Sequence, residues 1–171
     1  MANTFELIQA VNLTGTQSSI DFTVIPSNYT DLVVKYSTRI TSADTTWHMR
    51  INGSSSSIYS GKYLQGTGSG TGYSGSWSAQ NNDNFMVTNS SGYTASTFSN
   101  VEIYFPNYTS SNNKAYSVDE VTENNATGAV MFLNAGLFAS SSAISSISFY
   151  YSGSSDIAAY STAYLYGVKN A

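Results

Sequence analysis

Side chains that could perform acid–base chemistry are few in this sequence. His48 is the only histidine among 171 residues, and it alternates with the apolar residues of the stretch 47–51, so we expect it on the solvated outer face of a strand, beside Arg50. A Ser-His-Asp triad would have to recruit His48, and the chain has no G-x-S-x-G elbow. Ser111 and Lys114 match S-x-x-K, but they lie in an Asn-rich segment that is typical of a turn. The sequence therefore predicts no catalytic residue.

Acidic residues are the remaining candidates for metal binding or hydrolysis. Asp119, Glu120 and Glu123 lie close together, and Asp83 sits in the amide-rich run NNDN. Calcium prefers such oxygen ligands, but neither group matches an EF-hand loop. A zinc site is not expected, because the chain has one imidazole and no cysteine. We expect no metal and no cofactor, with calcium binding and a polysaccharide hydrolase that uses two carboxylates as open alternatives.

The stretch from Gly61 to Asp83 is rich in glycine. Its glycines at 66, 68, 70 and 72 occupy every second position, so the phosphate-binding pattern G-x-G-x-x-G fails. No helix is predicted to follow whose N-terminus could bind a phosphate. We interpret the stretch as a long loop between strands, which either is simply flexible or presents Tyr73 and Trp77 to a binding partner.

Aromatic side chains near predicted loops are the candidate binding residues. Tyrosine surrounded by Ser, Gly and Asn is the composition of antibody contact loops, where the ring supplies a large and rigid contact area. The candidates are Tyr59, Tyr73, Trp77 and Tyr93. Such a surface suits a neutral sugar or another protein subunit. Tyr36 and Tyr164, by contrast, are expected to pack in the core with their hydroxyls at its rim.

The low charge of the chain limits the kinds of partner it can bind. Charged residues make up 9% of the sequence and the net charge is −4, whereas ordinary domains have about 25% charged residues. Nucleic acid is not expected as a partner, because it requires clustered Lys and Arg. The N-terminus lacks the features of a signal peptide, and no apolar run approaches the about 20 residues of a membrane span. We therefore expect synthesis in a cytoplasm and no contact with a membrane.

Apolar and polar residues alternate with a period of two through most of the chain. The alternation predicts strands at 5–13, 19–25, 32–39, 47–52, 57–65, 84–88, 101–105, 113–121, 129–138, 147–151 and 161–168. Ser, Thr, Asn and Gly interrupt every potential helix. The sequence thus predicts an all-β fold, a single antiparallel two-sheet β-sandwich over residues 1–171 that is jelly-roll-like. An immunoglobulin-like sandwich is the alternative, although its Cys and Trp landmarks are missing.

Four segments of the chain resemble small β-sandwich domains of tailed-bacteriophage virion proteins. They span residues 19–39, 49–64, 100–118 and 143–168. The family pattern I-x-F-x-x-I-P-x-x-Y-x-x-L is matched by Ile20, Phe22, Ile25, Pro26, Tyr29 and Leu32. An N-G turn follows at Asn52-Gly53, and the closing strand ends in Leu165-Tyr166-Gly167. The resemblance covers most of the chain through short motifs.

The resemblance implies a non-enzymatic protein of the virion surface, commonly a homotrimer, that decorates the capsid or forms a tail-fibre tip. Ser54 follows the N-G turn where fibre tips often have an acidic residue, and we expect a stand-alone domain without a fibre shaft. Both features favour a capsid decoration protein, assembled in the host cytoplasm, that contacts the major capsid protein or other virion proteins. A tail-fibre or receptor-binding module that recognises a host surface glycan is the alternative.

Overall fold

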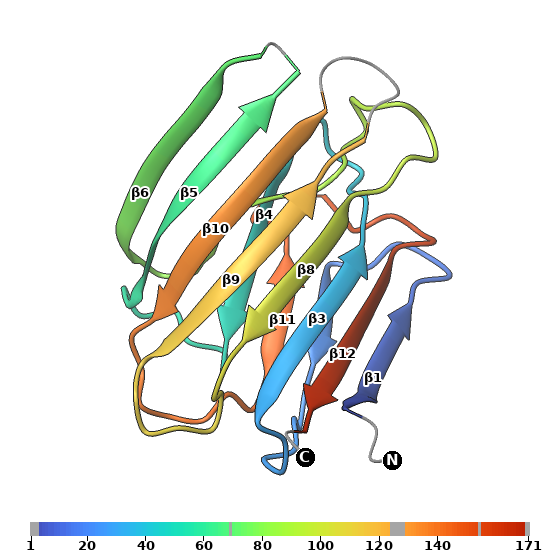
Figure 1. Ribbon diagram of the computed structural model, residues 1–171. Coiled ribbons are helices and arrows are strands. Elements are labelled where there is room, and N and C mark those ends of the chain that lie inside the picture. Colours follow the sequence, from blue (N-terminus) through green and yellow to red (C-terminus); the bar gives the residue numbers. More distant parts are fainter. Residues whose placement is uncertain (1–3, 69, 124–128, 154, 170–171) are drawn as a thin grey trace.

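Twelve strands and their connecting loops make up the described part of the chain, which in this computed structural model comprises residues 4–68, 70–123, 129–153 and 155–169 (Figure 1). The strands are β1 (Phe5–Asn12), β2 (Ser19–Phe22), β3 (Asp31–Ser37), β4 (Thr46–Ile51), β5 (Tyr59–Thr67), β6 (Gly72–Gln80), β7 (Asp83–Val87), β8 (Asn100–Phe105), β9 (Lys114–Val121), β10 (Val130–Phe138), β11 (Ile147–Tyr150) and β12 (Thr162–Val168). Among these described residues there is no helix of the length and hydrophobicity that a membrane span requires.

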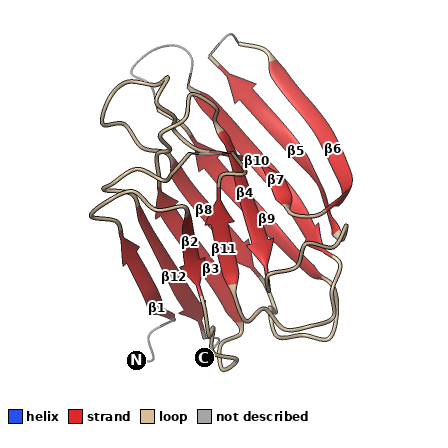
Figure 2. Cartoon of the chain, turned by 180° about the vertical axis from the view of Figure 1, so that it is seen from behind, coloured by secondary structure: helices blue, strands red, loops and turns tan. Residues whose placement is uncertain are grey.

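Two antiparallel sheets pack against each other in the order that a jelly roll requires. The large sheet has the order β1-β12-β3-β8-β9-β10-β5-β6, and the small sheet has the order β2-β11-β4-β7. Figure 1 looks onto the large sheet and Figure 2 shows the molecule from behind. The strand orders β1-β12-β3-β8 and β2-β11-β4-β7 are those of the two four-stranded sheets of a jelly roll with eight strands. The predicted all-β, jelly-roll-like sandwich is therefore confirmed.

Two hairpins widen one sheet beyond this eight-strand plan. The β5-β6 hairpin is inserted between β4 and β7, and the β9-β10 hairpin is inserted between β8 and β11. All four strands join the large sheet after β8, in the order β9-β10-β5-β6. The large sheet consequently has twice as many strands as the small one, and the additions enlarge the face that it turns away from the sandwich.

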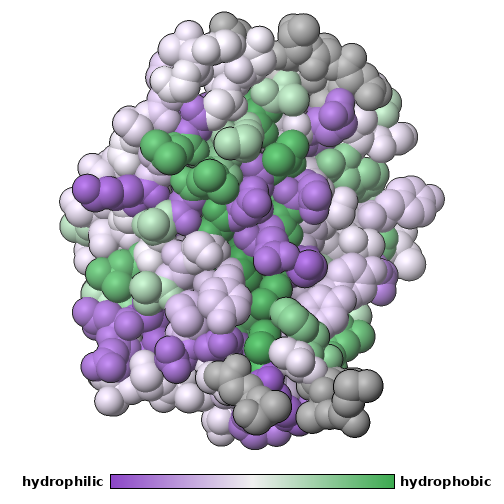
Figure 3. Space-filling model, viewed as in Figure 1, coloured by the Kyte–Doolittle hydropathy of each residue, from purple (hydrophilic) through white to green (hydrophobic). Residues whose placement is uncertain are grey.

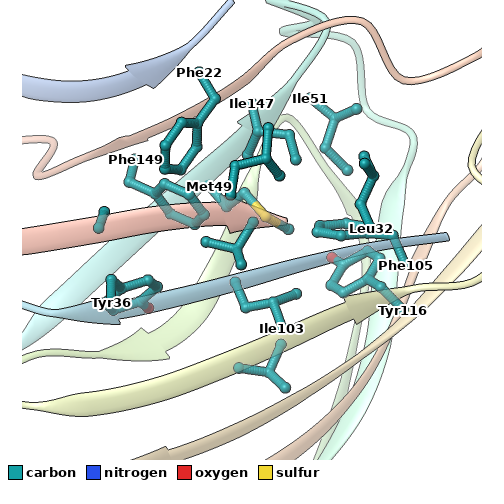
Figure 4. Packing of buried hydrophobic residues seen from close by; sticks show 14 of the residues in the cluster. Phe22, Leu32, Tyr36, Met49, Ile51, Ile103, Phe105, Tyr116, Ile147 and Phe149 are labelled. Carbon is teal, nitrogen blue, oxygen red and sulfur yellow. The ribbon is translucent and has the colours of Figure 1, made fainter. Parts of the chain in front are cut away.

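The core fills the space between the two sheets. Because successive side chains of a strand point to opposite faces, each strand contributes every second residue to this space. Phe149 lies near the middle, with its ring centroid 5.1 Å from that of Tyr36 and 6.5 Å from that of Trp47, on which it stacks. Figure 4 shows Phe149 and Met49 of the small sheet pointing towards Tyr36 and Ile103 of the large one. Both sheets thus share one hydrophobic cluster.

The glycine-rich stretch forms the β5-β6 hairpin, so its interpretation as a long loop is wrong. Gly61 pairs with Trp77, and Gly75 pairs with Tyr63. A Cβ atom at Gly61 would lie 2.4 Å from Cζ2 of Trp77, and one at Gly75 would lie 2.7 Å from Cε1 of Tyr63. Each glycine leaves room for the ring of its cross-strand partner to lie over the neighbouring backbone. Of the glycines at every second position, Gly66 lies on β5 and Gly72 on β6, whereas Gly68 and Gly70 lie in the turn that joins the two strands.

Candidate functional site

Two acidic side chains lie fully buried between the sheets. Asp83 belongs to β7 of the small sheet and Glu120 to β9 of the large sheet. The hydroxyl of Tyr116 donates a hydrogen bond to Oδ2 of Asp83, with 2.6 Å between the oxygens. Glu120 accepts one from the backbone N–H of Val87 at 3.1 Å and one from Nδ2 of Asn134 at 3.2 Å. The carboxyl groups are thus embedded in a hydrogen-bonded interior.

The environment of this cluster favours the neutral form of Glu120. Burial raises the pKa of Glu120 well above its usual range, and the nearby carboxyl of Asp83 acts in the same direction, against the lowering effect of the Val87 N–H. Burial and Asp83 likewise raise the pKa of the Tyr116 hydroxyl well above its ordinary value. A protonated acid that is enclosed by both sheets offers a substrate no access. The arrangement serves the core and supplies no pair of carboxylates across a cleft.

The acidic residues that are close in sequence do not come together in space. Asp119 and Glu120 are neighbours on β9, so their side chains point to opposite faces of the sheet. Asp119 is exposed and Glu120 is buried. Across the described ranges, no group of three or more His, Cys, Asp or Glu side chains is placed to hold a metal ion.

His48 lies on the outer face of the small sheet as expected, but the prediction that it is solvated is wrong. Only 6% of its surface is exposed. Its ring stacks on Tyr150 with 5.4 Å between centroids, and its Nδ1 lies 3.3 Å from Oδ1 of Asn82. Burial lowers the pKa of His48, so that the imidazole is neutral at pH 7. Tyr150 and Asn82 cover the ring on a face that alternation alone assigns to solvent.

The S-x-x-K match has a structural explanation. Lys114 is almost completely buried. Its ammonium group donates hydrogen bonds to the carbonyls of Ser110, Asn112 and Ser140. Lys114 therefore holds together the turn that precedes β9 and the loop that follows β10.

The four candidate aromatic residues do not form one surface. Tyr59 is fully buried, and its hydroxyl accepts a hydrogen bond from the N–H of Ile51 at 2.8 Å. Trp77 is only 6% exposed because its ring lies over Gly61. Placing these two residues at the surface was wrong: Tyr59 belongs to the shared core, and Trp77 packs against Gly61 and Tyr63 of the neighbouring strand β5. Tyr73, on β6, is 52% exposed.

Tyr93 is half-buried in the loop between β7 and β8, and Arg39 anchors that loop. The guanidinium group of Arg39 donates hydrogen bonds to the carbonyls of Tyr93 at 3.1 Å, Thr94 at 2.9 Å and Thr97 at 3.0 Å. These three carbonyls are fixed by one planar cation with donors in a rigid fork. Tyr93 is consequently presented by an ordered loop.

Replacing Arg39 should loosen this loop. An Arg39→Lys variant keeps the charge but replaces the two separate donor nitrogens of Arg39, Nη1 and Nη2, with one ammonium group. Each charge-assisted hydrogen bond that is lost contributes about 1.5–3 kcal/mol. We expect amide hydrogen exchange in residues 93–97 to become at least about tenfold faster. The amides of β10 serve as the internal control and should exchange at the wild-type rate. Unchanged protection of residues 93–97 would show that Arg39 does not hold the loop.

The outer face of the large sheet carries most of the exposed large hydrophobic side chains, and sequence reasoning missed it. Figure 3 shows apolar groups interrupting the hydrophilic surface of this face. Seven of the ten such residues in the described part of the chain lie here, namely Phe5, Leu7, Leu64, Tyr104, Val121, Met131 and Leu133. The signal was present in β10, whose sequence VMFLNAGLF is apolar on both faces. A strand with one solvated face would alternate instead.

Strand register divides this apolar surface into two parts. Leu133 pairs with Leu64, and Met131 pairs with Val121, so these four side chains form one contiguous patch over β9, β10 and β5. We call this set of four the aliphatic patch. Phe5 and Leu7 lie on β1, at the opposite edge of the same sheet. The aliphatic patch therefore occupies the part of the sheet that the two inserted hairpins add.

Charged side chains lie beside the aliphatic patch. Nζ of Lys35 forms an ion pair with Oε2 of Glu102 at 2.8 Å, and Asp119 is the next residue across the sheet from Glu102. Lys62 lies on β5, on the same outer face, and is exposed. The two ion pairs recorded among the described residues are Lys35–Glu102 and Lys169–Glu6, so neither Lys62 nor Asp119 takes part in one.

Shallow hollows accompany these side chains. Leu133 borders three of them, with volumes of about 580, 220 and 390 Å³. The largest also has Lys62, Leu64 and Ser76 in its lining. The face thus combines aliphatic ridges, hollows and two charges of opposite sign. Such a surface is suited to binding a protein rather than to performing chemistry.

Comparison with known proteins finds no matching family model, no matching curated protein and no matching solved structure.

Proposed function

We propose that this chain is a non-enzymatic structural protein of a bacteriophage virion, a capsid decoration protein that contacts copies of itself and the major capsid protein. The observation that carries the proposal is the exposed apolar outer face of the large sheet. Monomeric soluble proteins seldom leave large contiguous apolar patches in water, and larger ones mark sites of protein–protein contact. The face lies on regular strands, so it is rigid enough to repeat the same contact at many lattice positions.

Surface composition supports the same role. With 9% charged residues, the surface depends mainly on neutral hydroxyl, amide and aromatic groups. Hydrogen bonds and apolar contacts are weakened by salt far less than exposed ion pairs are. A protein with such a surface keeps its contacts when a particle moves between media of different ionic strength. This property suits a component of the particle exterior.

Locating the chain on particles tests the proposal. Virions from the host that produces this chain are purified, and the chain is quantified against the major capsid protein by mass spectrometry and located by antibody labelling. We expect many copies per particle, with label over the capsid. Label confined to the tail would instead support the alternative, a receptor-binding module of the tail. Absence from purified particles would contradict a virion role altogether.

Tyr73 favours the second candidate, a tail module that recognises a host surface glycan. Its exposed ring on β6 could stack on the apolar face of a sugar, with Gln65 directly opposite on β5 as a hydrogen-bonding neighbour. A glycan array that compares the wild type with Tyr73→Ala tests this candidate. Binding that is lost in the variant would support it, whereas equal binding would remove Tyr73 from the site. Trp77 is not a useful target, since its substitution would disturb the core.

A further inference from the structure

We infer that the outer face of the large sheet pairs with the same face of a second copy of this chain, about a two-fold axis that passes beside Leu133. The pairing does not depend on the virion assignment, because it rests only on the shape and charge of the face. Four features of the face support this pairing: its strand register, the positions of Lys62 and Asp119, the hollows beside Leu133 and the area that it covers.

Register places the outward side chains of the sheet in rows that cross the strands. One row contains Glu102, Asp119, Leu133, Leu64 and Ser74, in that order from β8 to β6. The adjacent row contains Tyr104, Ser117, Ala135, Lys62 and Ser76. These two rows give the relative positions of these ten outward residues on β8, β9, β10, β5 and β6.

Within these two rows, the two charged residues without an ion pair, Lys62 and Asp119, are placed symmetrically about β10. Asp119 lies one strand to one side of β10 and Lys62 lies one strand to the other side, in adjacent rows. The midpoint between them falls on β10, between Leu133 and Ala135. A two-fold axis through that point, lying in the plane of the face and perpendicular to the line that joins the two residues, brings Lys62 of each copy onto Asp119 of the other. One isologous contact therefore forms two ion pairs, as a self-complementary surface requires.

The shape of the face, with its protruding side chains and hollows, favours the same axis. Residues beside a two-fold axis contact their own counterparts, so Leu133 of one copy meets the Leu133 region of the other. Leu133 borders three hollows, and Leu64 stands beside two of them. Leu133 and Leu64 of the aliphatic patch of one copy can therefore enter the hollows of the second copy. Burying these side chains supplies the attraction, and the two ion pairs fix the register.

The extent of the contact predicts an association of modest strength. The covered part runs from β8 to β6, which is five strands. Four strand spacings of about 4.8 Å and a strand length of about 27 Å give roughly 500 Å² a copy, or about 1,000 Å² in total. This total is at the lower end of specific interfaces. We therefore expect dimers in exchange with monomers at micromolar concentrations.

A charge-reversal cycle on the purified chain tests the inference. Sedimentation velocity is measured over a range of micromolar concentrations for the wild type, Lys62→Glu, Asp119→Lys and the double variant. The wild type should approach twice the 18.3 kDa of the chain. Each single reversal opposes like charges twice and should weaken dimerisation at least about tenfold, whereas the double variant restores opposite charges and should recover near-wild-type affinity. All of these side chains are exposed, so the fold should be retained, and circular dichroism verifies it.

A second variant probes the apolar centre of the contact. Leu133→Asp brings two carboxylates together beside the axis, and we expect it to abolish the dimer. The matched control is Val24→Asp, which places the same charge at an exposed apolar position outside the sheets and should leave the dimer intact.

Three results would overturn the inference: a wild type that stays monomeric at every concentration, a double reversal that does not recover, or a larger oligomer that Leu133→Asp leaves unchanged. The last would fit the homotrimer that the sequence resemblance implies, held together by another surface. If the chain stays monomeric but requires Leu133 to bind particles, the face contacts a different virion protein and not a second copy of the chain. None of these results depends on where the chain lies on the particle, which the labelling of virions decides separately.

Discussion

Replacing Glu120 with Gln should stabilise the protein increasingly as the pH rises. Glu120 is buried and protonated in the folded state, with a pKa raised well above the ordinary 4.5 that applies in the unfolded chain. Between these two pKa values the folded state holds one proton more than the unfolded state, so the free energy of unfolding falls by about 1.4 kcal/mol per pH unit. Glutamine keeps the shape and an accepting oxygen for the Val87 N–H but carries no titrating group. The variant therefore escapes this loss.

The measurement is the difference in unfolding free energy between Glu120→Gln and the wild type, from urea titrations at several pH values from about 5 upwards. Taking the difference cancels the contribution of His48 to the free energy of unfolding, because this contribution is the same in both proteins. Burial lowers the pKa of His48, so its contribution to stability is lost as the pH falls. We expect the difference to grow by about 1.4 kcal/mol per unit in favour of the variant. Asp156→Asn, at an exposed position, is the control and should show no such trend. Parallel curves for Glu120→Gln and the wild type would contradict a protonated Glu120.

Gly136→Ala should destabilise the fold strongly, although the substitution adds one methyl group. A Cβ atom at Gly136 would lie 2.1 Å from Cζ of Tyr116, the ring whose hydroxyl is bonded to buried Asp83. The ring cannot move away without breaking that bond or displacing the core, so we expect a loss of about 1–3 kcal/mol. Thermal unfolding should begin several degrees lower, about 2–4 °C for each kcal/mol.

Gly66→Ala is the matched control for this substitution. Gly66 lies on β5, the neighbouring strand, and a Cβ atom there would meet nothing within 4 Å. It should melt within about 2 °C of the wild type. Equal melting temperatures for Gly136→Ala and Gly66→Ala would show that the Tyr116 ring is free to yield, and would remove the proposed role of glycine opposite an aromatic ring.

Most of the fold was predictable from period-two alternation, with one informative exception. Every predicted strand range overlaps an observed strand, and β6 is the strand that was missed. Its sequence, GYSGSWSAQ, carries Tyr73, Gly75 and Trp77 on one face and serines on the other. Glycine and serine have low strand propensity in isolation. Here pairing with β5 decides the structure, because Gly75 receives the ring of Tyr63 and Gly61 receives that of Trp77.

The interior acids and the exposed face could be predicted only in part. Alternation on β9 shows that Asp119 and Glu120 face opposite ways, but which of them is buried depends on β7 lying over that part of the large sheet. That contact joins segments distant in sequence. Likewise, the aliphatic patch arises only when β10 pairs with both β9 and β5, which brings Leu64 and Val121 to opposite sides of β10. Local sequence patterns carry no information about such neighbours.

A reconstruction of the virion by electron cryomicroscopy tests the proposed function most directly. The account predicts jelly-roll densities of the size of this chain repeated over the capsid, with the outer face of the large sheet buried against a neighbouring protein. Densities confined to the tail, or capsid densities in which Leu64, Met131 and Leu133 face solvent, would contradict it.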